Sequence, residues 1–140
     1  MKALIVNLNL AVNKTVLTKR LEKGRIYRFA ETLTAPGGKG VNVARALLAW
    51  GLRSKITGFV SGFNSLWIEQ ALKAEGLDAF LVRHKSGESR VCLSVVDSTG
   101  LSTNFNEEGP VVPPRAQAYF LRRLSSMAGG FKMMAVCGRV

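Results

Sequence analysis

The sequence predicts an α/β fold in which a parallel sheet is covered by helices and a small second sheet is attached to it. Three segments with helical spacing, 41–51, 65–76 and 114–128, alternate with apolar strand-like segments, which is typical of β-α-β units. Two pairs of strand-like segments, within 15–35 and 89–107, interrupt the alternation and are predicted to form the small sheet. With 140 residues, 47% of them hydrophobic, the chain can bury the core of one ordinary domain or of part of a larger one.

The first part of the chain contains three predicted strands. Residues 3–11, "ALIVNLNLA", are mostly apolar and are typical of a buried strand. Residues 15–21 and 25–35 alternate polar with apolar side chains on either side of Lys23-Gly24. This pattern predicts two half-exposed strands joined by a turn at the glycine.

The remaining elements are separated by glycine and proline. Gly51 and Gly76 follow the first two predicted helices as C-terminal caps, and Pro113 and Pro114 begin the third. The remaining strands are predicted from short apolar runs bounded by turn residues: 55–62, 79–84, 89–97, 101–109 and 131–140.

The stretch "APGGKGVNVARALLAWG" places a proline and three glycines directly before a helix. Gly37 and Gly38 allow a ligand to approach the backbone closely, and a helix N-terminus offers unpaired N–H groups with a partial positive charge. Lys39 adds a full charge, and Asn42 lies close enough for its amide to face the turn. The stretch therefore predicts an anion-binding turn, although a tight turn that only happens to be rich in glycine is the alternative. Its spacing is neither G-x-G-x-x-G nor G-x-x-x-x-G-K-[ST].

The charge of the chain is strongly basic, with a formal net charge of +11. Residues 1–70 hold 11 Lys and Arg against 3 Asp and Glu, so the basic excess accompanies the glycine turn. Such a balance favours anionic partners, either phosphorylated metabolites or nucleic acid, although a solvated basic surface is the alternative. Nucleic acid is the weaker choice because most aromatic residues fall in predicted core segments and are not interleaved with basic ones.

The motifs quoted above resemble the ribokinase/PfkB family of sugar kinases, and most of all its 1-phosphofructokinase and tagatose-6-phosphate kinase branch. The resemblance covers nearly all 140 residues in order and includes, besides the glycine turn, the segments "NLNLAVN" (7–13), "KGRIYR" (23–28), "GFVSGFNSLWIEQALKAEGL" (58–77), "SRVCLSVVDSTGLSTNFNEEGP" (89–110) and "VCGRV" (136–140). It implies the N-terminal half of a ribokinase-like three-layer α/β fold. In that fold, 15–35 and 89–107 would be the two hairpins of a β lid, with an apolar face drawn from Val91, Leu93, Val95, Ile26 and Phe29.

The resemblance also assigns roles to individual residues. Gly37 and Gly38 would let the acceptor sugar lie against the backbone, and Asn42 would bond a hydroxyl. Asn13 stands where the family usually has an Asp that grips two hydroxyls, so the charge-assisted bond of that Asp is lost. Arg90 matches an arginine that contacts the phosphate already on the sugar, and Arg25 matches a lid cation that serves that phosphate in a neighbouring subunit. The full set of expected substrate-binding residues is Asn13, Arg25, Gly37, Gly38, Lys39, Asn42, Arg90 and Arg139.

The reaction implied is ATP-dependent phosphorylation, with Mg²⁺, of a ketohexose phosphate such as fructose 1-phosphate. The family's G-A-G-D motif, which carries the general base, does not occur in these 140 residues, so no catalytic residue and no ATP or metal ligand is assigned here. We therefore expect residues 1–140 to be a truncated domain without its ATP-binding part and inactive alone. The chain would be a gene fragment, a truncated product or one piece of a split protein. The alternatives are a non-catalytic sugar-phosphate or anion-binding fragment and a non-functional remnant.

Partners and location follow from the same reasoning. The resemblance implies a phosphorylated sugar as ligand and either a homodimer through the lid or a complementary C-terminal fragment as partner. No run of about 18 apolar residues occurs, so no membrane span is expected. Cys92 and Cys137 lie in apolar runs without metal-ligand spacing, which predicts buried, reduced thiols in a cytoplasmic protein. His84 is expected in a solvated loop, and the strand at 131–138 is expected to have helix cover on at most one face.

Overall fold

The computed structural model describes residues 2–138 and contains two four-stranded sheets and three helices. The main sheet has the strand order β5-β4-β1-β8 and is parallel throughout. Its strands are β1 (Lys2–Asn7), β4 (Arg53–Ser61), β5 (Asp78–His84) and β8 (Met133–Cys137). The predicted class of a parallel sheet with helices is confirmed.

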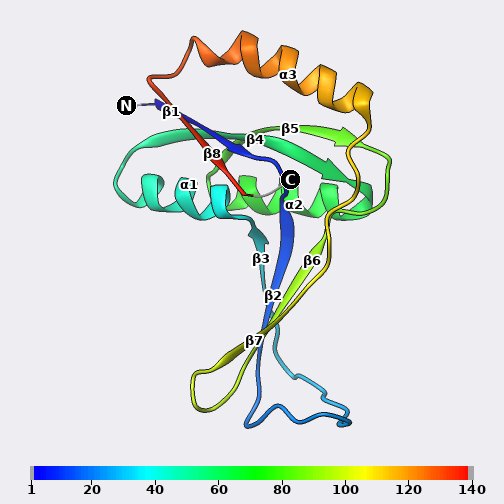
Figure 1. Cartoon of the computed structure of the whole chain (residues 1–140). Coiled ribbons are helices and arrows are strands. Elements are labelled where there is room, and N and C mark those ends of the chain that lie inside the picture. Colours follow the sequence, from blue (N-terminus) through cyan, green and yellow to red (C-terminus); the bar gives the residue numbers. More distant parts are fainter. Residues whose placement is uncertain (1, 139–140) are drawn as a thin grey trace.

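The helices cover the main sheet on both faces, which gives three layers (Figure 1). Helices α1 (Lys39–Ala49) and α2 (Gly62–Ala74) lie on one face, and α3 (Pro114–Ala128) lies on the other. Because neighbouring residues of a strand point to opposite faces, Ile5 joins the core under α1 and α2, whereas Val6 joins the smaller core around Phe120 of α3.

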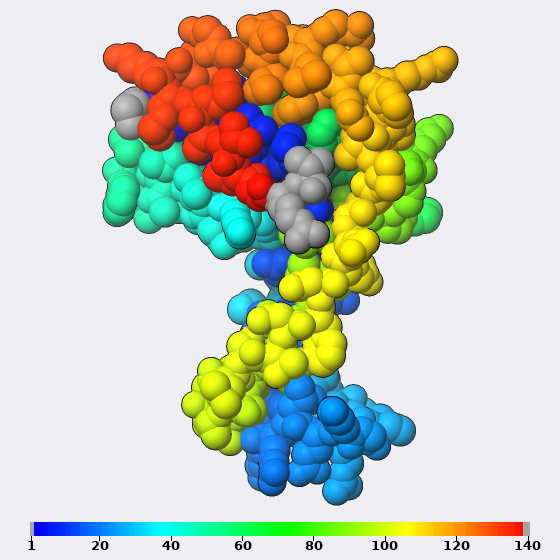
Figure 2. All heavy atoms as spheres, viewed as in Figure 1, coloured from blue at the N-terminus to red at the C-terminus, as the bar shows by residue number. Residues whose placement is uncertain are grey.

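The second sheet stands away from this body as a lid with the strand order β3-β2-β6-β7 (Figure 1). Its strands are β2 (Ala11–Leu17), β3 (Leu33–Gly37), β6 (Val91–Val96) and β7 (Ser102–Asn106). Strands β2 and β6 pair in parallel, and β3 and β7 flank them in antiparallel pairs. Figure 2 shows the lid as a separate lobe that joins the body through a narrow waist.

The two faces of the lid differ in polarity. Asn13, Cys92 and Asn106 are register partners, so they share one face. The next row on this face contains Thr15, Ser94 and Asn104, and Ser94 Oγ donates to Asn104 Oδ1 at 2.6 Å. The opposite face carries the aliphatic residues Val12, Val16, Val91, Leu93 and Val95. The lid therefore has the predicted apolar face as far as Val91, Leu93 and Val95 are concerned, with Lys14 beside Leu93. The face that carries Asn13 is polar in these two rows, and the apolar pair Leu17 and Val96 follows toward the lid tip.

The predicted strands of the first lid hairpin are partly wrong. The strand predicted at 3–11 ends at Asn7, and the chain bends before β2 begins at Ala11, because this segment crosses from the main sheet into the lid. Between β2 and β3, residues 18–32 form a loop and not the strand expected over 25–35. Local side-chain bonds occupy backbone groups of this loop: the Tyr27 hydroxyl accepts from Glu22 N at 2.7 Å and donates to Arg20 O at 3.0 Å.

Three smaller expectations have different outcomes. Ile26, which is 82% exposed, and Phe29 both lie on that loop, so neither belongs to the strands that form the apolar face of the lid. His84 is the last residue of β5 and is buried, so the prediction of a solvated loop is wrong. The one-sided cover of β8 is confirmed: Cys137 packs on the core under α1, whereas Val136 is 69% exposed.

Candidate functional site

The glycine turn lies where the lid strand β3 runs into helix α1. Gly37 is the last residue of β3, Gly38 is the N-cap of α1, and the helix begins at Lys39. Gly38 has φ +126°, a conformation that favours glycine. Gly38 has no side chain that could cap the helix, and the first turn of α1 contains no acidic residue, so no carboxylate from within the helix neutralises its N–H groups and its dipole.

Asn13 meets this turn directly. It lies on β2, which pairs with β3, and a β-carbon at Gly37 would collide with the Asn13 carboxamide. The absence of a side chain at Gly37 is therefore what allows the amide of Asn13 to lie against the turn. The structure brings together three of the expected substrate-binding positions here: Asn13, Gly37 and Gly38.

Asn7, at the end of β1, packs against the glycine turn. It is fully buried, and a β-carbon at Gly38 would collide with its Nδ2 and one at Gly40 would lie 2.6 Å from its Cβ. Its Oδ1 accepts a long hydrogen bond of 3.5 Å from Gly40 N, and its Nδ2 has no partner within residues 2–138. Sequence reasoning missed Asn7, although an asparagine that closes the run "ALIV" is a visible signal of a buried polar group with a specific role.

Asn42 lies in the first turn of α1, exposed, with its N–H donating to Gly38 O at 3.2 Å. Its carboxamide Oδ1 accepts from Arg45 Nη1 at 2.9 Å. The same guanidinium donates to Pro36 O at 2.7 Å, directly before the glycine turn. Arg45 was not among the expected residues, and its spacing of three from Asn42 was the available signal.

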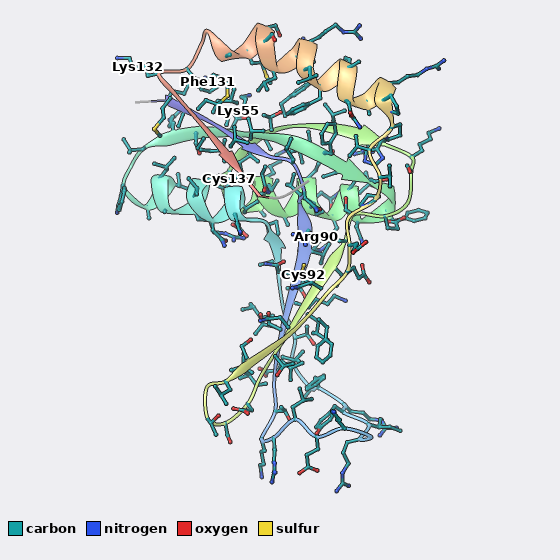
Figure 3. All side chains as sticks on the ribbon, viewed as in Figure 1. Lys55, Arg90, Cys92, Phe131, Lys132 and Cys137 are labelled. Atoms are coloured by element: carbon teal, nitrogen blue, oxygen red, sulfur yellow. The ribbon has the colours of Figure 1, made fainter. Side chains whose placement is uncertain are left out.

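Arg90 lies where the lid meets the body, just before β6 (Figure 3). It stands two residues before Cys92, the register partner of Asn13, so it lies on the same side of the lid. Its side chain is half-buried, and its Nε has no hydrogen-bond partner within the described residues. Cys92 and Cys137 are free thiols and are half-buried, not fully buried as expected.

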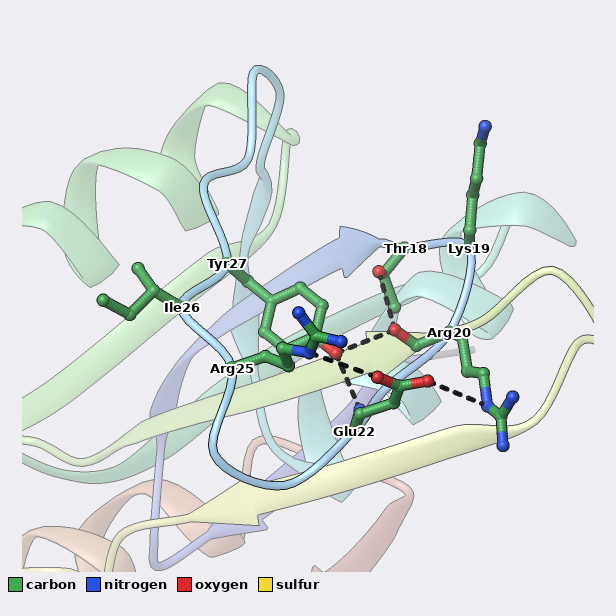
Figure 4. A pocket seen from close by; sticks show the side chains of 7 residues that line it. All are labelled: Thr18, Lys19, Arg20, Glu22, Arg25, Ile26 and Tyr27. Carbon is green, nitrogen blue, oxygen red and sulfur yellow. Dashed lines mark hydrogen bonds and ion pairs between the residues drawn. The ribbon is translucent and has the colours of Figure 1, made fainter.

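Arg25 lies far from the glycine turn, in the loop at the tip of the lid (Figure 4). The loop residues Thr18, Lys19, Arg20, Glu22, Arg25, Ile26 and Tyr27 line a shallow hollow there. Glu22 pairs with Arg25 at 3.3 Å and with Arg20 at 3.4 Å, and the guanidinium of Arg25 is mostly exposed. The structure does not bring Arg25 to the turn of its own chain.

The remaining expected residues are Lys39 and Arg139. Lys39 is exposed as the first residue of α1, next to the helix N-terminus, and Arg139 lies outside the described residues.

No group of three or more His, Cys, Asp or Glu side chains that could hold a metal occurs within residues 2–138. No helix in that part of the chain is long and apolar enough to cross a membrane.

A parallel sheet with helices on both faces, a β lid, and a glycine turn that leads from the lid into a helix together define a carbohydrate-kinase fold. The family model described as "pfkB family carbohydrate kinase" matches residues 4–119. The chain belongs to the pfkB family of carbohydrate kinases.

Several 1-phosphofructokinases are similar to this chain. That of Bacillus subtilis is 32% identical over 125 residues, which cover 89% of this chain and 40% of the relative. That of Haemophilus influenzae is 26% identical over 133 residues, or 95% of this chain and 42% of the relative. The chain thus spans about two fifths of the length of the curated relatives it matches.

Solved structures agree with the fold. A Thermotoga maritima protein described as a possible 1-phosphofructokinase superposes with a TM-score of 0.93 at 28% identity, over 100% of this chain and 45% of that one. Phosphofructokinase-2 from Escherichia coli, solved with fructose-6-phosphate, gives a TM-score of 0.84 at 19% identity over 98% of this chain and 45% of that one. The second likeness shows the shared fold alone.

Proposed function

We propose that residues 1–140 form the acceptor-binding and lid part of an ATP-dependent sugar-phosphate kinase that acts on a ketohexose phosphate such as fructose 1-phosphate. The observation that carries this proposal is the placement of the Asn13 carboxamide against Gly37, beside the N-terminus of α1. An amide both donates and accepts hydrogen bonds, so it can bond sugar hydroxyls in either sense. The names of the similar relatives support the choice of fructose 1-phosphate.

The phosphate of the substrate has a suitable partner in Arg90. Arg90 forms no ion pair within residues 2–138, and arginine suits phosphate through its planar fork of donors. Arg90 lies on the same side of the lid as Asn13. We assign hydroxyl recognition to Asn13, Gly37, Gly38 and Asn42, and phosphate recognition to Arg90 with support from Lys39.

The side chains at the glycine turn do not fit Mg²⁺. Mg²⁺ is normally held by carboxylates and substrate phosphates, whereas the side chains at the turn are amides and cations, and no metal-binding cluster occurs within residues 2–138. In this proposal these residues supply acceptor binding and do not carry out phosphoryl transfer. In this proposal ATP and Mg²⁺ belong to the family's reaction and bind through groups outside these residues.

The position of Arg25 favours a homodimer. Arg25 lies in the loop 18–32, which is at the end of the lid away from the glycine turn (Figures 1 and 4), so in this proposal it serves the site of a partner chain whose lid packs against this one. The solved Escherichia coli phosphofructokinase-2 includes a tetrameric form. A complementary C-terminal fragment is the other partner consistent with the proposal, and the cytoplasm is the proposed location.

Isothermal titration calorimetry on the 140-residue chain tests acceptor binding. We expect fructose 1-phosphate to bind, and N13A and Arg90→Met each to weaken binding at least tenfold, because each loses one or more hydrogen bonds to the ligand. Arg83→Met is the matched control, since it removes an arginine paired with Glu69 outside the turn. Equal affinity in wild type, N13A and Arg90→Met would contradict the proposal.

The same preparation also tests the limited role of these residues. With ATP, Mg²⁺ and fructose 1-phosphate we expect no ADP release above that of a matched preparation from cells without the gene. Sugar-dependent turnover by the chain alone would overturn the assignment of phosphoryl transfer to groups outside it.

A further inference from the structure

Arg45 holds three elements together at the back of the glycine turn. Its Nη2 donates to Pro36 O at 2.7 Å at the end of β3, and its Nη1 donates to Asn42 Oδ1 at 2.9 Å in α1. Its Nε and Nη2 donate to the two carboxylate oxygens of Glu75 at 2.6 and 2.8 Å, at the C-terminal end of α2. One guanidinium thus connects the strand before the turn, the helix after it and the neighbouring helix.

The geometry of this contact depends on arginine. The bidentate pair with Glu75 fixes the plane of the guanidinium, and both partners are about two-thirds buried, with exposed fractions of 33% and 31%. In that fixed plane the remaining donors reach Pro36 O and Asn42 Oδ1. A lysine, with one point of charge on a flexible stem, cannot supply these separate donors in a fixed arrangement.

The bond from Arg45 determines which atom of the Asn42 carboxamide remains available to a ligand. Because Oδ1 is already bonded to a cation, the amide is held in one orientation, and its Nδ2 makes no hydrogen bond within residues 2–138. Asn42 therefore presents its Nδ2 as a donor, whereas its Oδ1 keeps only one lone pair for a second hydrogen bond. A sugar or phosphate oxygen can accept from Nδ2.

We propose that Arg45 is a positioning residue of the sugar-phosphate site, which acts by fixing the Asn42 amide and the Pro36 carbonyl at the two ends of the glycine turn. This proposal rests on the proposed function. It assigns Arg45 no contact with the ligand. The competing explanation is that Arg45 and Glu75 are an ordinary ion pair that only joins α1 to α2.

The chain offers a matched control for that explanation. Arg83 of β5 pairs with Glu69 of α2 at 2.7 Å, with exposed fractions of 47% and 37%. This pair also joins α2 to a neighbouring element, but it touches neither Asn42 nor the glycine turn. Arg83→Met therefore removes a comparable ion pair and leaves the site intact.

A double-mutant cycle measured by calorimetry with fructose 1-phosphate is the first test. We expect Arg45→Met to weaken affinity about tenfold, because an unrestrained amide and a loosened turn lose a defined hydrogen bond, and Arg83→Met to change it less than twofold. Once Asn42→Ala is present, adding Arg45→Met should cost less than a further threefold, because the two residues act as one unit. Independent effects that multiply, or an equal loss in Arg83→Met, would overturn the proposal.

The second test needs no ligand. In ¹H–¹⁵N spectra of the free 140-residue chain, the side-chain NH₂ resonance of Asn42 should shift in Arg45→Met and in Arg45→Lys but not in Arg83→Met. If the wild-type chain does not bind fructose 1-phosphate, the proposed function fails, and the NH₂ resonance alone decides the role of Arg45. An Asn42 resonance that is unchanged in Arg45→Met would overturn it.

Discussion

At the residue scale, two adjacent glycines do different work at the turn. Gly38 combines a positive φ with contact to the fully buried Asn7, which cannot move aside. Gly37 has no positive φ and lies against Asn13, whose half-exposed side chain can rotate away. A methyl group at Gly38 should therefore lower the stability of the fold, whereas a methyl group at Gly37 should mainly weaken ligand binding.

The alanine variants of these glycines test this difference. We expect Gly38→Ala to lower the free energy of unfolding by about 2–4 kcal/mol, from backbone strain plus the collision with Asn7. Gly37→Ala should cost about 1 kcal/mol or less in stability but weaken fructose 1-phosphate binding, because it displaces the Asn13 amide. Urea unfolding gives the first quantity and calorimetry the second.

Gly24→Ala is the control for backbone strain. Gly24 has φ +76°, and no atom lies within 4 Å of the position that a β-carbon would take there, so its alanine variant reports strain alone, about 1–2 kcal/mol. A Gly38→Ala variant no less stable than Gly24→Ala would show that the contact with Asn7 is not a tight one.

The sequence predicts the residues of the turn itself, but it does not predict the side chains that pack against the turn and bond to it. Pro36 through Asn42 are visible as a motif because several glycines stand directly before a segment with helical spacing. Asn7 and Arg45 were missed because their importance arises from residues far along the chain: Asn7 contacts a turn more than 30 positions away, and Arg45 bonds Glu75.

At the scale of elements, the end of strand β5 carries a buried histidine, His84, whose protonation state affects the stability of the fold. It closes β5, with its ring in an edge contact with Phe59 and its Nδ1 accepting from Ser86 N at 3.3 Å. Its Nε2 is buried without a partner within the described residues. Burial lowers the pKa of His84 below its ordinary value of 6.5, because the charged ring loses hydration. Protonation would also place an N–H at Nδ1 against the N–H of Ser86.

The expected consequence is a loss of stability in mild acid. The folded state disfavours the proton that the unfolded chain accepts below about pH 6.5, so the free energy of unfolding should be constant just above pH 7 and fall as pH drops through 6.5 toward the lower folded pKa. His84 is the single histidine of the chain. His84→Gln should therefore remove this slope between pH 7 and 5.5 in urea unfolding curves, and a wild-type stability without slope there would contradict the burial of His84.

Element prediction succeeded where the hydrophobic pattern and the environment agree. The third helix was predicted at its observed bounds of 114–128 because proline and glycine mark both ends. The predicted strand over 25–35 is present only from Leu33 onward, because alternation alone cannot show that Tyr27 and Glu22 satisfy the backbone locally. The register that places Asn13 beside Cys92 also lay beyond the sequence, since it depends on how two distant segments pair.

At the scale of the whole molecule, the chain is a body and a lid that meet at one place. Strand β1 passes into β2, β3 passes into α1, and Arg90 precedes β6, all at the waist between the two lobes (Figures 1 and 3). Of the expected site residues that the structure describes, all but Arg25 lie at or beside this waist. This architecture supports the proposal of a site built jointly by lid strands and the N-terminus of α1.

The central claim is that this waist binds a sugar phosphate, and a chemical-shift titration of the ¹⁵N-labelled 140-residue chain with fructose 1-phosphate tests it most directly. The account predicts saturable shifts concentrated at Asn13, Gly37 to Asn42 and Arg90, with much smaller changes when fructose or inorganic phosphate replaces the sugar phosphate. Shifts confined to the lid-tip loop 18–32, shifts scattered over the surface, or no shifts at all would contradict it.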